Sequence, residues 1–358
     1  MLYRETGQFK TSYPKDQAIF PIAQDKAFIL LVLAVAFLAV PPFINDYYAK
    51  AILIPFLSYT MAAIGLNILV GYCGQISLGT GGFMAVGAFA TYKLMTSFPG
   101  LDFAAVVVLA GFVTAGVGAL FGLPSLRIKG FYLAVATLAA QFFLVWLFNK
   151  VGWFYNYSPT GQITAPPATS FGVLVTGPEA SPAAGYLFCL IFVCIFALVA
   201  KNLTRGNIGR QWMAIRDMDI AAELVGVQPL RAKLSAFAVS SFFIGMAGAL
   251  YFGVWLGAAE PTEAFGINIS FLVLFMIIIG GLGSILGSFL GAAFMVLLPI
   301  ALKTVMVDGM GLQAVTAKHF EILLLGVLII FFLIVEPHGL ARLWSTVKEK
   351  LRLWPFPY

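Results

Sequence analysis

The stretch Ala27-Phe-Ile-Leu-Leu-Val-Leu-Ala-Val-Ala-Phe-Leu-Ala-Val-Pro-Pro-Phe-Ile44 contains no charged side chain. About 20 predominantly apolar residues cross the hydrocarbon core of a bilayer as a helix, which satisfies every backbone polar group internally. The whole chain repeats this pattern, since 61% of its residues are hydrophobic, 10% are charged and its mean hydropathy is +0.97. The sequence therefore predicts an all-α polytopic membrane protein.

Reading the remaining apolar runs in the same way predicts about ten transmembrane helices. They cover residues 27–44, 51–70, 75–96, 103–124, 131–149, 184–200, 234–257, 268–282, 284–302 and 321–335. This assignment divides the chain into an N-terminal segment (1–26), a transmembrane domain (27–336) and a C-terminal tail (337–358). The N-terminal segment is too polar and too mixed in charge for a secretory signal, so we expect the first apolar run to remain as a span.

The basic residues set the orientation of these spans, because cytoplasmic loops carry an excess of Lys and Arg. With the N-terminus inside, 16 of the 21 basic residues are cytoplasmic. These are Arg4, Lys10, Lys15, Lys26, Arg127, Lys129, Lys201, Arg205, Arg210, Arg216, Arg231, Lys233, Arg342, Lys348, Lys350 and Arg352. Only Lys50, Lys93, Lys150, Lys303 and Lys318 are left for the other side. The predicted topology is N-in and C-in, and orientation accounts for the net charge of +6 without a nucleic-acid partner.

Several kinds of chemistry have no matching residues in the sequence. No ionisable residue lies in the middle of a predicted span, which weakens an ion-coupled mechanism, although backbone carbonyls and hydroxyls alone can hold sodium. There is no phosphate-binding loop, no zinc spacing and no nucleophile elbow. Cys73, Cys189 and Cys194 lie in or beside apolar runs and are interpreted as small hydrophobes. We therefore expect neither enzymatic activity, nor a bound metal, nor a cofactor on this chain.

Glycines recur at helical spacing in the later spans, where small residues let helix backbones approach closely. The set predicted to pack helices is Gly245, Gly248, Gly280, Gly281, Gly283, Gly287 and Gly291. The alternative interpretation is that these glycine faces slide or rock past one another. A different glycine-rich segment, 71–89, surrounds the polar pair Gln75 and Ser77. It predicts an interrupted helix whose freed backbone groups line a cavity or meet a neighbouring helix, or else a plain turn.

The longest predicted cytoplasmic loop, 201–233, contains a stretch that mixes helix formers with charges. An uneven apolar stripe would run along this helix, and Gly226 would end it. The stripe comprises Trp212, Ile215, Ile220, Leu224 and Val227. One interpretation is a helix lying on the lipid surface. Acidic side chains at Asp217, Asp219 and Glu223 favour a helix that docks into a soluble partner instead.

Five blocks of the chain together resemble the LivM-type permease subunits of bacterial branched-chain amino acid importers. The blocks are Gly74-Gln-Ile-Ser-Leu-Gly79 with Phe83 and Gly87, Gly209-Arg-Gln-Trp-Met-Ala-Ile-Arg-Asp217 leading into Ala221-Ala-Glu-Leu-Val-Gly226, Lys233 through Gly248-Ala-Leu-Tyr251, Gly280-Gly-Leu-Gly-Ser284 and Pro337-His-Gly-Leu340. The resemblance covers about residues 50–345. The chain departs from the family pattern at Thr80, where a His is common, and at Gly161-Gln162, where a Gly-Gly pair is usual.

The resemblance implies a subunit of an ATP-binding-cassette importer in the bacterial inner membrane. Its expected partners are a LivH-type permease subunit, two cytoplasmic ATPase subunits that carry ATP and magnesium, a periplasmic solute-binding protein and the lipid bilayer. The matching loop would contain the coupling helix that sits in a groove of the ATPase. The residues expected to couple are Arg210, Ala214, Arg216, Asp217, Ala221, Ala222, Glu223 and Gly226.

The route of the solute is less defined by the sequence than the coupling loop. Polar candidates along a pathway are Asn67, Gln75 and Ser77, with Gly79 beside them. The outer loop 150–183 is long enough to meet a binding protein, or to form a lid. Two alternatives stay open: a related importer for urea or short amides, and a solitary carrier that works without ATP.

Overall fold

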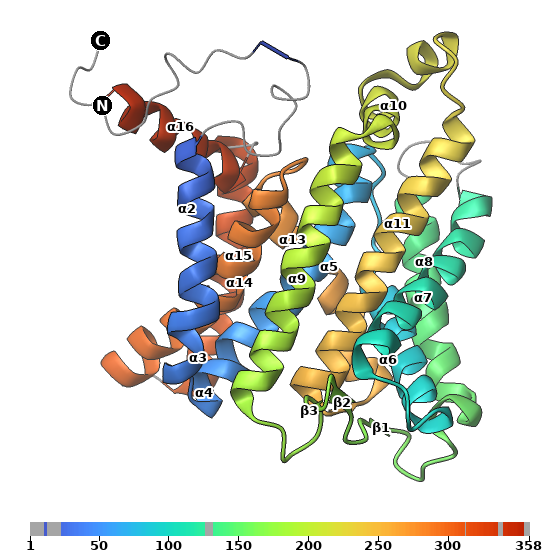
Figure 1. Cartoon of the computed structure of the whole chain (residues 1–358), viewed down its shortest axis with the longest axis vertical. Helices are drawn as coiled ribbons and strands as arrows, with labels where there is room; N and C mark the ends of the chain where they lie inside the picture. The colour runs from blue at the N-terminus through green and yellow to red at the C-terminus, as the bar shows by residue number, and fades with distance from the viewer. Residues whose placement is uncertain (1–10, 13–22, 126–131, 312, 336–338, 354–358) are drawn as a thin grey trace.

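The apolar runs become helices that stand side by side in a computed structural model of the chain (Figure 1). The structure describes residues 11–12, 23–125, 132–311, 313–335 and 339–353. Several sequence predictions fall elsewhere, namely those on most of the N-terminal segment, on Arg127 and Lys129, on Pro337 and His338, and on the last five residues of the tail. These lie outside the described residues.

The first half of the chain forms five membrane-competent or nearly membrane-competent helical segments. They are α2 (Ala23–Ala34) with η1 (Val35–Ala39) and α3 (Val40–Phe43), then α4 (Asp46–Tyr48), η2 (Ala49–Leu53), α5 (Ile54–Asn67) and η3 (Ile68–Tyr72), then α6 (Thr80–Ser97), α7 (Phe103–Ser125) and α8 (Tyr132–Lys150). Pro41, Pro42 and Pro55 follow the π-helical segments η1 and η2 inside continuous helices, where the wider turn accommodates residues that lack a backbone donor. Segment α4–η3 is longer than the predicted span 51–70, because four consecutive elements run on without a break.

The second half begins with an outer loop and ends with a helix that follows the last span. Its elements are η4 (Gly152–Tyr155), β1 (Ile163–Thr164), β2 (Thr169–Ser170), β3 (Val173–Leu174), α9 (Pro182–Arg205), α10 (Asn207–Leu224), α11 (Pro229–Leu250), η5 (Tyr251–Leu256), β4 (Ala258–Ala259), α12 (Pro261–Ala264), α13 (Ile267–Gly280), α14 (Ile285–Lys303), η6 (Thr304–Gly309), α15 (Ala314–Val335) and α16 (Gly339–Leu353). The α9 helix starts with Ser181 as its cap, whose Oγ accepts from the Ala184 amide, and Pro182 follows.

Nine helical segments in the described residues are long and apolar enough to cross a membrane. The remaining predicted span, 75–96, corresponds to α6, which is shorter than predicted because residues 74–79 are not helical. Most of α6 is nevertheless buried inside the protein. The all-α polytopic fold is therefore confirmed. The predicted span 75–96 differs from the structure because α6 starts later, inside the bundle.

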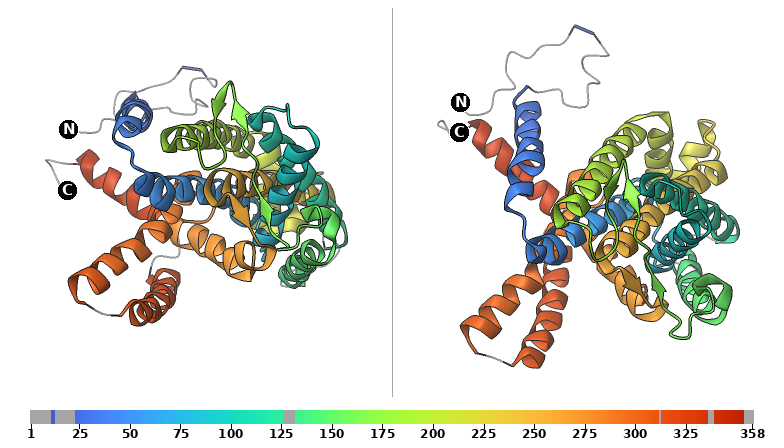
Figure 2. Two further views of the ribbon diagram at one scale, coloured as in Figure 1. Left: turned by 90° about the horizontal axis from the view of Figure 1, so that it is seen from below. Right: turned by 60° about the horizontal axis from the view of Figure 1, so that its bottom comes forward.

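Burial distinguishes central from peripheral helices. Over 18-residue stretches of the spans that contain α5 and α11, 83% and 78% of the residues are buried, whereas none are buried in the corresponding stretch of the span that contains α2. Helix α11 packs against α5 and α6 at the centre of the bundle, and α7 packs against α11 from the side with part of its surface exposed. Figure 2 shows α14 and α15 leaning away from this centre, with α15 exposing much of its apolar surface.

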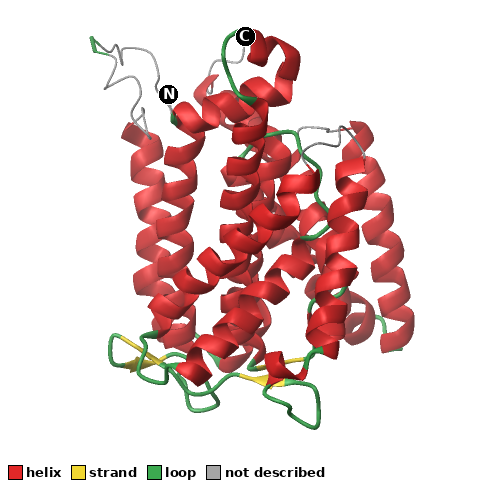
Figure 3. Cartoon of the chain, turned by 90° about the vertical axis from the view of Figure 1, so that its right-hand side faces the viewer, coloured by secondary structure: helices red, strands yellow, loops and turns green. Residues whose placement is uncertain are grey.

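Connections gather at the two ends of the helices. Helices α10 and α16 lie at one end, and the short strands lie at the other (Figures 1 and 3). Strand β1 of the outer loop pairs antiparallel with β4, which follows η5, and β2 pairs with β3. With α10 on the cytoplasmic side, as its basic residues predict, the strands close the outer side.

Candidate functional site

Helix α10 consists of two parts that meet at Met218. The backbone there is extended (φ −161°, ψ 100°), which breaks the helix. The first part packs on the bundle through the fully buried Trp212, whose Nε1 donates to Ser235 Oγ of α11 at 2.9 Å. Gly209 lies so close to α9 that an added Cβ would be 2.2 Å from the Thr204 carbonyl oxygen. The first part of α10 is thereby fixed to both α9 and α11.

The second part of α10 projects from the bundle. Ile220, Leu224 and Val225 are 66%, 85% and 80% exposed, although all three are apolar. The predicted stripe from Trp212 to Val227 is therefore wrong as a single face, because the break at Met218 turns the second part away. The sequence analysis missed this exposed apolar tip, since helical periodicity assumes an unbroken helix.

Arg216 connects α10 with the end of α5. Its Nη1 donates to the carbonyl oxygen of Gly71 at 2.9 Å, and its Nε and Nη2 contact Asp217 Oδ1, each at 2.9 Å. Gly74 has φ +72° and lies against the arginine, because an added Cβ would be 2.9 Å from Arg216 Cγ. The guanidinium therefore reaches back into the bundle, while its acidic neighbour stays exposed.

Asn67 holds the turn between α13 and α14. Its Oδ1 accepts from the Gly283 amide at 2.8 Å, and its Nδ2 donates to the Ser284 carbonyl oxygen at 2.8 Å and to Ser288 Oγ at 3.0 Å. The side chain is almost fully buried, so these bonds are not exchanged with water. Asn67 was predicted to line a pathway; the structure places it in a clamp, and its role in a pathway stays a prediction.

Glycines make this clamp sterically possible. An added Cβ on Gly71 would lie 2.0 Å from Asn67 Oδ1 and 2.2 Å from the Gly283 amide nitrogen. Gly281 and Gly283 have φ +119° and +74°, which L side chains rarely adopt. These two were predicted to pack helices, and the structure corrects this: they form the turn outside α13 and α14. Arg216, Gly71, Gly283 and Asn67 therefore make one continuous contact from α10 to α5 and to this turn.

The other predicted glycines lie where backbones touch. An added Cβ on Gly248 would be 2.0 Å from the Met84 carbonyl oxygen, and one on Gly245 would be 2.3 Å from Thr114 Oγ1. In the α13·α14 pair, the corresponding distances are 2.0 Å from Gly280 to the Gly287 carbonyl oxygen and 1.8 Å from Gly291 to the Met276 carbonyl oxygen. Each of these glycines permits an approach that a side chain would prevent.

The interrupted segment passes between helices before α6 begins. Gln75 and Ser77 are buried, and the backbone N–H of Gln75 donates to the Leu69 carbonyl oxygen at 3.1 Å. The Leu78 amide donates to Thr137 Oγ1 at 2.9 Å, and the Gly79 amide to Ser77 Oγ at 3.4 Å. Among the described residues, Gln75 Oε1 has no hydrogen-bond partner. The freed backbone thus meets neighbouring helices, which is one of the two outcomes expected of an interrupted helix.

Two polar side chains from distant spans cap the buried start of α6. The Gly81 amide donates to Ser270 Oγ of α13 at 2.8 Å, and the Gly82 amide donates to Gln141 Oε1 of α8. Gln141 Nε2 in turn donates to the Phe265 carbonyl oxygen at 2.7 Å. The first amides of a helix have no intrahelical acceptor, so these side chains satisfy them inside the bundle. Sequence reasoning missed Gln141 and Ser270; their signal was a polar residue within an apolar run.

The remaining coupling candidates differ in exposure. Arg210, Asp217, Ala221, Glu223 and Gly226 are exposed, Ala214 is half-buried and Ala222 is buried. Arg210 donates from Nη2 to Asn207 Oδ1 within the same helix. Their roles stay predictions, but five of the candidates lie on the outward surface of α10 and the segment after it.

At the outer end, Asp102 anchors the strands β2 and β3. Its carboxylate accepts from the Phe171 amide at 2.7 Å, the Ala104 amide at 2.8 Å and Ser170 Oγ at 2.9 Å. Desolvation by itself would raise the pKa of Asp102, but these hydrogen bonds to the charged form outweigh it and lower the pKa. The outer loop is thus tied to the start of α7 by a carboxylate that is charged at neutral pH.

Comparison with known proteins agrees with this arrangement. The family of permease components of branched-chain amino acid transport systems matches residues 48–333. The chain is 33% identical to the high-affinity branched-chain amino acid transport permease LivM of Salmonella typhimurium, over 87% of this chain and 73% of that protein. LivM of Escherichia coli is 32% identical over the same shares, and a probable LivM of Methanocaldococcus jannaschii is 25% identical over 81% and 92%.

No solved structure gives a significant match to the chain. The family match covers every central helix and the break in α10, together with the Asn67 clamp and the buried start of α6. The glycine-rich turn and the loop 201–233 also fall inside it, so the site described above lies in the shared region. The chain belongs to the family of branched-chain amino acid transport permeases, as a membrane-spanning subunit.

Proposed function

We propose that this permease subunit translocates branched-chain amino acids in an importer driven by ATP hydrolysis on separate subunits. The observation that carries the proposal is α10, which exposes Ile220, Leu224 and Val225 at one end of the molecule. A soluble protein that covers these side chains removes them from water, at roughly 25 cal/mol per Å² of apolar surface. An ATPase subunit with a matching groove is the partner that the family membership favours.

Direct contacts can transmit a movement of α10 into the helical bundle. Trp212 fixes α10 to α11, and Arg216 fixes it to the Gly71 carbonyl oxygen in η3, which continues α5. Asn67, the last residue of α5, is bonded to the turn between α13 and α14. A displacement of α10 therefore acts on four membrane-spanning segments, those of α5, α11, α13 and α14, as a change from outward to inward opening requires.

Partners and location follow from the same proposal. A second, LivH-type permease would pack beside this subunit, two ATPases would bind ATP and magnesium on the cytoplasmic side, and a periplasmic binding protein would deliver the solute to the outer loop. The membrane would be the bacterial inner membrane. Specificity would rest largely with the binding protein, so urea or short amides are the alternative solutes that a transport assay must include.

The test separates docking from transmission with two variants of the assembled importer. Leu224→Ser removes an exposed apolar contact, so we expect the ATPase subunits to be lost when the tagged permease is purified. Arg216→Gln keeps the tip but removes the bond to Gly71, so we expect the ATPases to be retained while leucine-stimulated hydrolysis falls at least tenfold. Lys150→Gln, which alters an exposed basic residue at the end of α8 and outside α10, is the control.

The readouts are co-purification, ATP hydrolysis in nanodiscs and leucine uptake into proteoliposomes. Normal coupling in both variants would overturn the proposed route. Uptake of leucine by the purified chain alone, without ATP, would replace the proposal by a solitary carrier. Stimulation of ATP hydrolysis by urea but not by leucine would support an ATP-driven importer whose solute is urea.

A further inference from the structure

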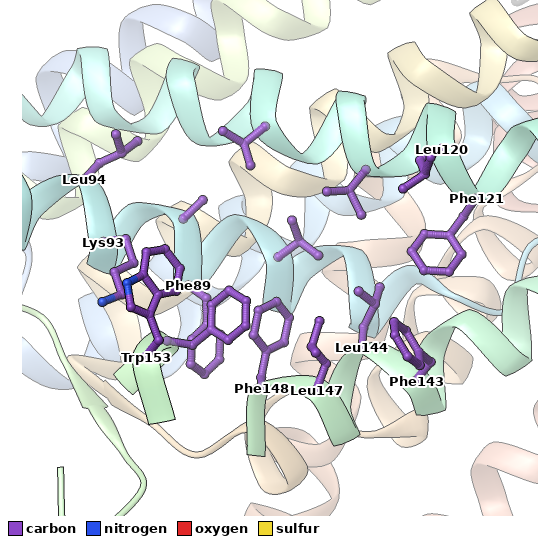
Figure 4. Close-up of a pocket in the computed structure, with 15 residues that line it drawn as sticks. Phe89, Lys93, Leu94, Leu120, Phe121, Phe143, Leu144, Leu147, Phe148 and Trp153 are labelled. Carbon is purple, nitrogen blue, oxygen red and sulfur yellow. The ribbon is translucent and has the colours of Figure 1, made fainter. Parts of the chain in front are cut away.

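A groove of about 440 Å³ runs along the side of the bundle between α7 and α8, with α6 as its floor (Figure 4). Fifteen side chains line it, and all except Lys93 are apolar. Phe89, Leu144 and Phe148 at the bottom are nearly fully buried. The groove lies away from α10, so no part of it belongs to the coupling site.

The groove opens sideways, toward the surface that a bilayer would cover. Val113, Leu120 and Phe143 on its walls are 47%, 67% and 46% exposed. Helices α7 and α8 are both membrane-competent along the whole stretch that lines the groove. In a membrane these walls face hydrocarbon, and a water-filled apolar groove at that depth is unfavourable.

The one charged side chain marks the outer end of the groove. Lys93 Nζ lies 4.2 Å from the ring centroid of Trp153 and hydrogen-bonds to Asn156 Oδ1. In Figure 4, Lys93 and Trp153 meet at one end, whereas Leu120, Phe121 and Phe143 lie at the other. Lysine and tryptophan side by side are typical of the level of the lipid headgroups.

The dimensions of the groove indicate what can enter it. Val113 and Phe121 line it from α7, and the step of eight positions from one to the other rises about 12 Å along a helix. The groove therefore runs lengthwise along α7, with a volume of about 440 Å³. A flexible acyl chain that lies parallel to α7 matches this shape and the apolar lining.

The geometry points to a binding site for one anionic phospholipid of the outer leaflet. An acyl chain occupies the groove over Phe89 and Phe148, and Lys93 holds the headgroup phosphate while keeping its contact with Trp153. Moving a methylene out of water gains about 0.8 kcal/mol, but the tails of a free lipid already lie in hydrocarbon and gain nothing in this way. The preference for an anionic lipid therefore comes from the charge of Lys93 and from the fit of the acyl chain to the groove. The lipid would also brace η4, because Phe148 and Phe154 have ring centroids 4.9 Å apart at the same end.

Native mass spectrometry of the purified importer, with phosphatidylglycerol or phosphatidylcholine added in equal amounts, tests this inference. We expect one tightly retained phosphatidylglycerol per copy of this chain. One cation near the headgroups is worth about a fivefold preference, so Lys93→Gln should lower the preference for phosphatidylglycerol about fivefold. Ala90→Leu, on the floor of the groove, should weaken retention of both lipids.

Two control variants keep the experiment specific. Lys50→Gln removes another exposed lysine, one that pairs with Asp46 outside the groove, and should leave retention unchanged. Leu109→Phe adds volume on an exposed part of α7 that does not line the groove. Equal retention in wild type, Lys93→Gln and Ala90→Leu would overturn the inference. A cross-link from Leu120→Cys to a partner permease inside the groove would overturn it as well.

Discussion

Asn67 and Arg216 each replace a hydrogen bond that the backbone cannot make for itself. In the turn after α13, Asn67 Oδ1 accepts a hydrogen bond from the Gly283 backbone amide. Asn67 Nδ2 also donates to the Ser284 carbonyl oxygen. Arg216 satisfies a carbonyl oxygen at the end of α5 with a charged donor, and such bonds are stronger than neutral ones. At this scale, single side chains decide which helices act together.

The first prediction concerns the Asn67 clamp. Asn67→Ala leaves the Gly283 amide without its acceptor in a buried site, whereas the Ser284 carbonyl oxygen keeps its bond from the Ser288 amide at 3.2 Å. An unsatisfied buried donor costs about 1–3 kcal/mol, so we expect the stability of the permease to fall by about that amount. The measurement is the melting temperature of the purified permease in detergent.

Asn149→Ala is the matched control for this prediction. Asn149 is exposed and bonds only to Thr262 Oγ1 at 2.9 Å, so its loss should change stability by less than about 0.5 kcal/mol. Equal melting temperatures for the Asn67 and Asn149 variants would mean that water replaces the clamp.

Among the elements, α6 and α11 approach each other closely through glycines on both helices. An added Cβ on Gly87 would lie 2.0 Å from the Gly245 carbonyl oxygen, and one on Gly248 would lie 2.0 Å from that of Met84. The obstacle is backbone in both directions, so no side-chain rotation relieves it. Lipid offers no hydrophobic drive to hold helices together, and the close backbone contact takes its place.

The second prediction therefore compares the same substitution in three helix positions. Gly87→Ala and Gly248→Ala should each force α6 and α11 apart and destabilise the permease by at least about 1–3 kcal/mol. Gly116→Ala in α7 meets nothing within 4 Å and should be neutral or stabilising, by up to about 1 kcal/mol, because alanine is the better helix former. Thermal unfolding of the three variants in one detergent measures the difference. Equal destabilisation by all three substitutions would contradict the packing explanation, and so would unchanged stability of Gly87→Ala and Gly248→Ala.

Over the whole molecule, the two ends carry different structures. The outer end is closed by short strands that Asp102 and the β1–β4 pair attach to the bundle. The other end carries α10 and α16, whose basic residues favour the cytoplasmic side. The end with the basic helices and the end with the short strands are therefore opposite ends of the molecule.

The third prediction tests this orientation in intact cells. Phe171, in the outer loop, is 90% exposed, and Leu351, in α16, is 46% exposed. In a background without the three native cysteines, a membrane-impermeant maleimide should label Phe171→Cys from outside and Leu351→Cys only after lysis. The reverse pattern would contradict the N-in topology.

The helices could be predicted because apolar length, read over about 20 residues, gives the spans. The count of Lys and Arg in each loop predicts their sides, which the labelling experiment tests. The predicted span 75–96 began too early, although the glycines around Gln75 and Ser77 predicted an interrupted helix there. The break at Met218 was missed, because the helical pattern continues through it while the backbone leaves the helix.

The sequence by itself determined the membrane class and the approximate spans, and it predicts the sidedness and the coupling role of the loop 201–233. Only the tertiary structure decided that Asn67 clamps a turn 216 residues away and that Arg216 meets Gly71 across 145 residues. It also decided that Gly281 and Gly283 form that turn and that Gln141 and Ser270 cap a buried helix start. The physical reason is that hydrophobic length and charge act through the solvent and the bilayer along the chain, whereas hydrogen bonds and close contacts exist only between groups that folding has brought together.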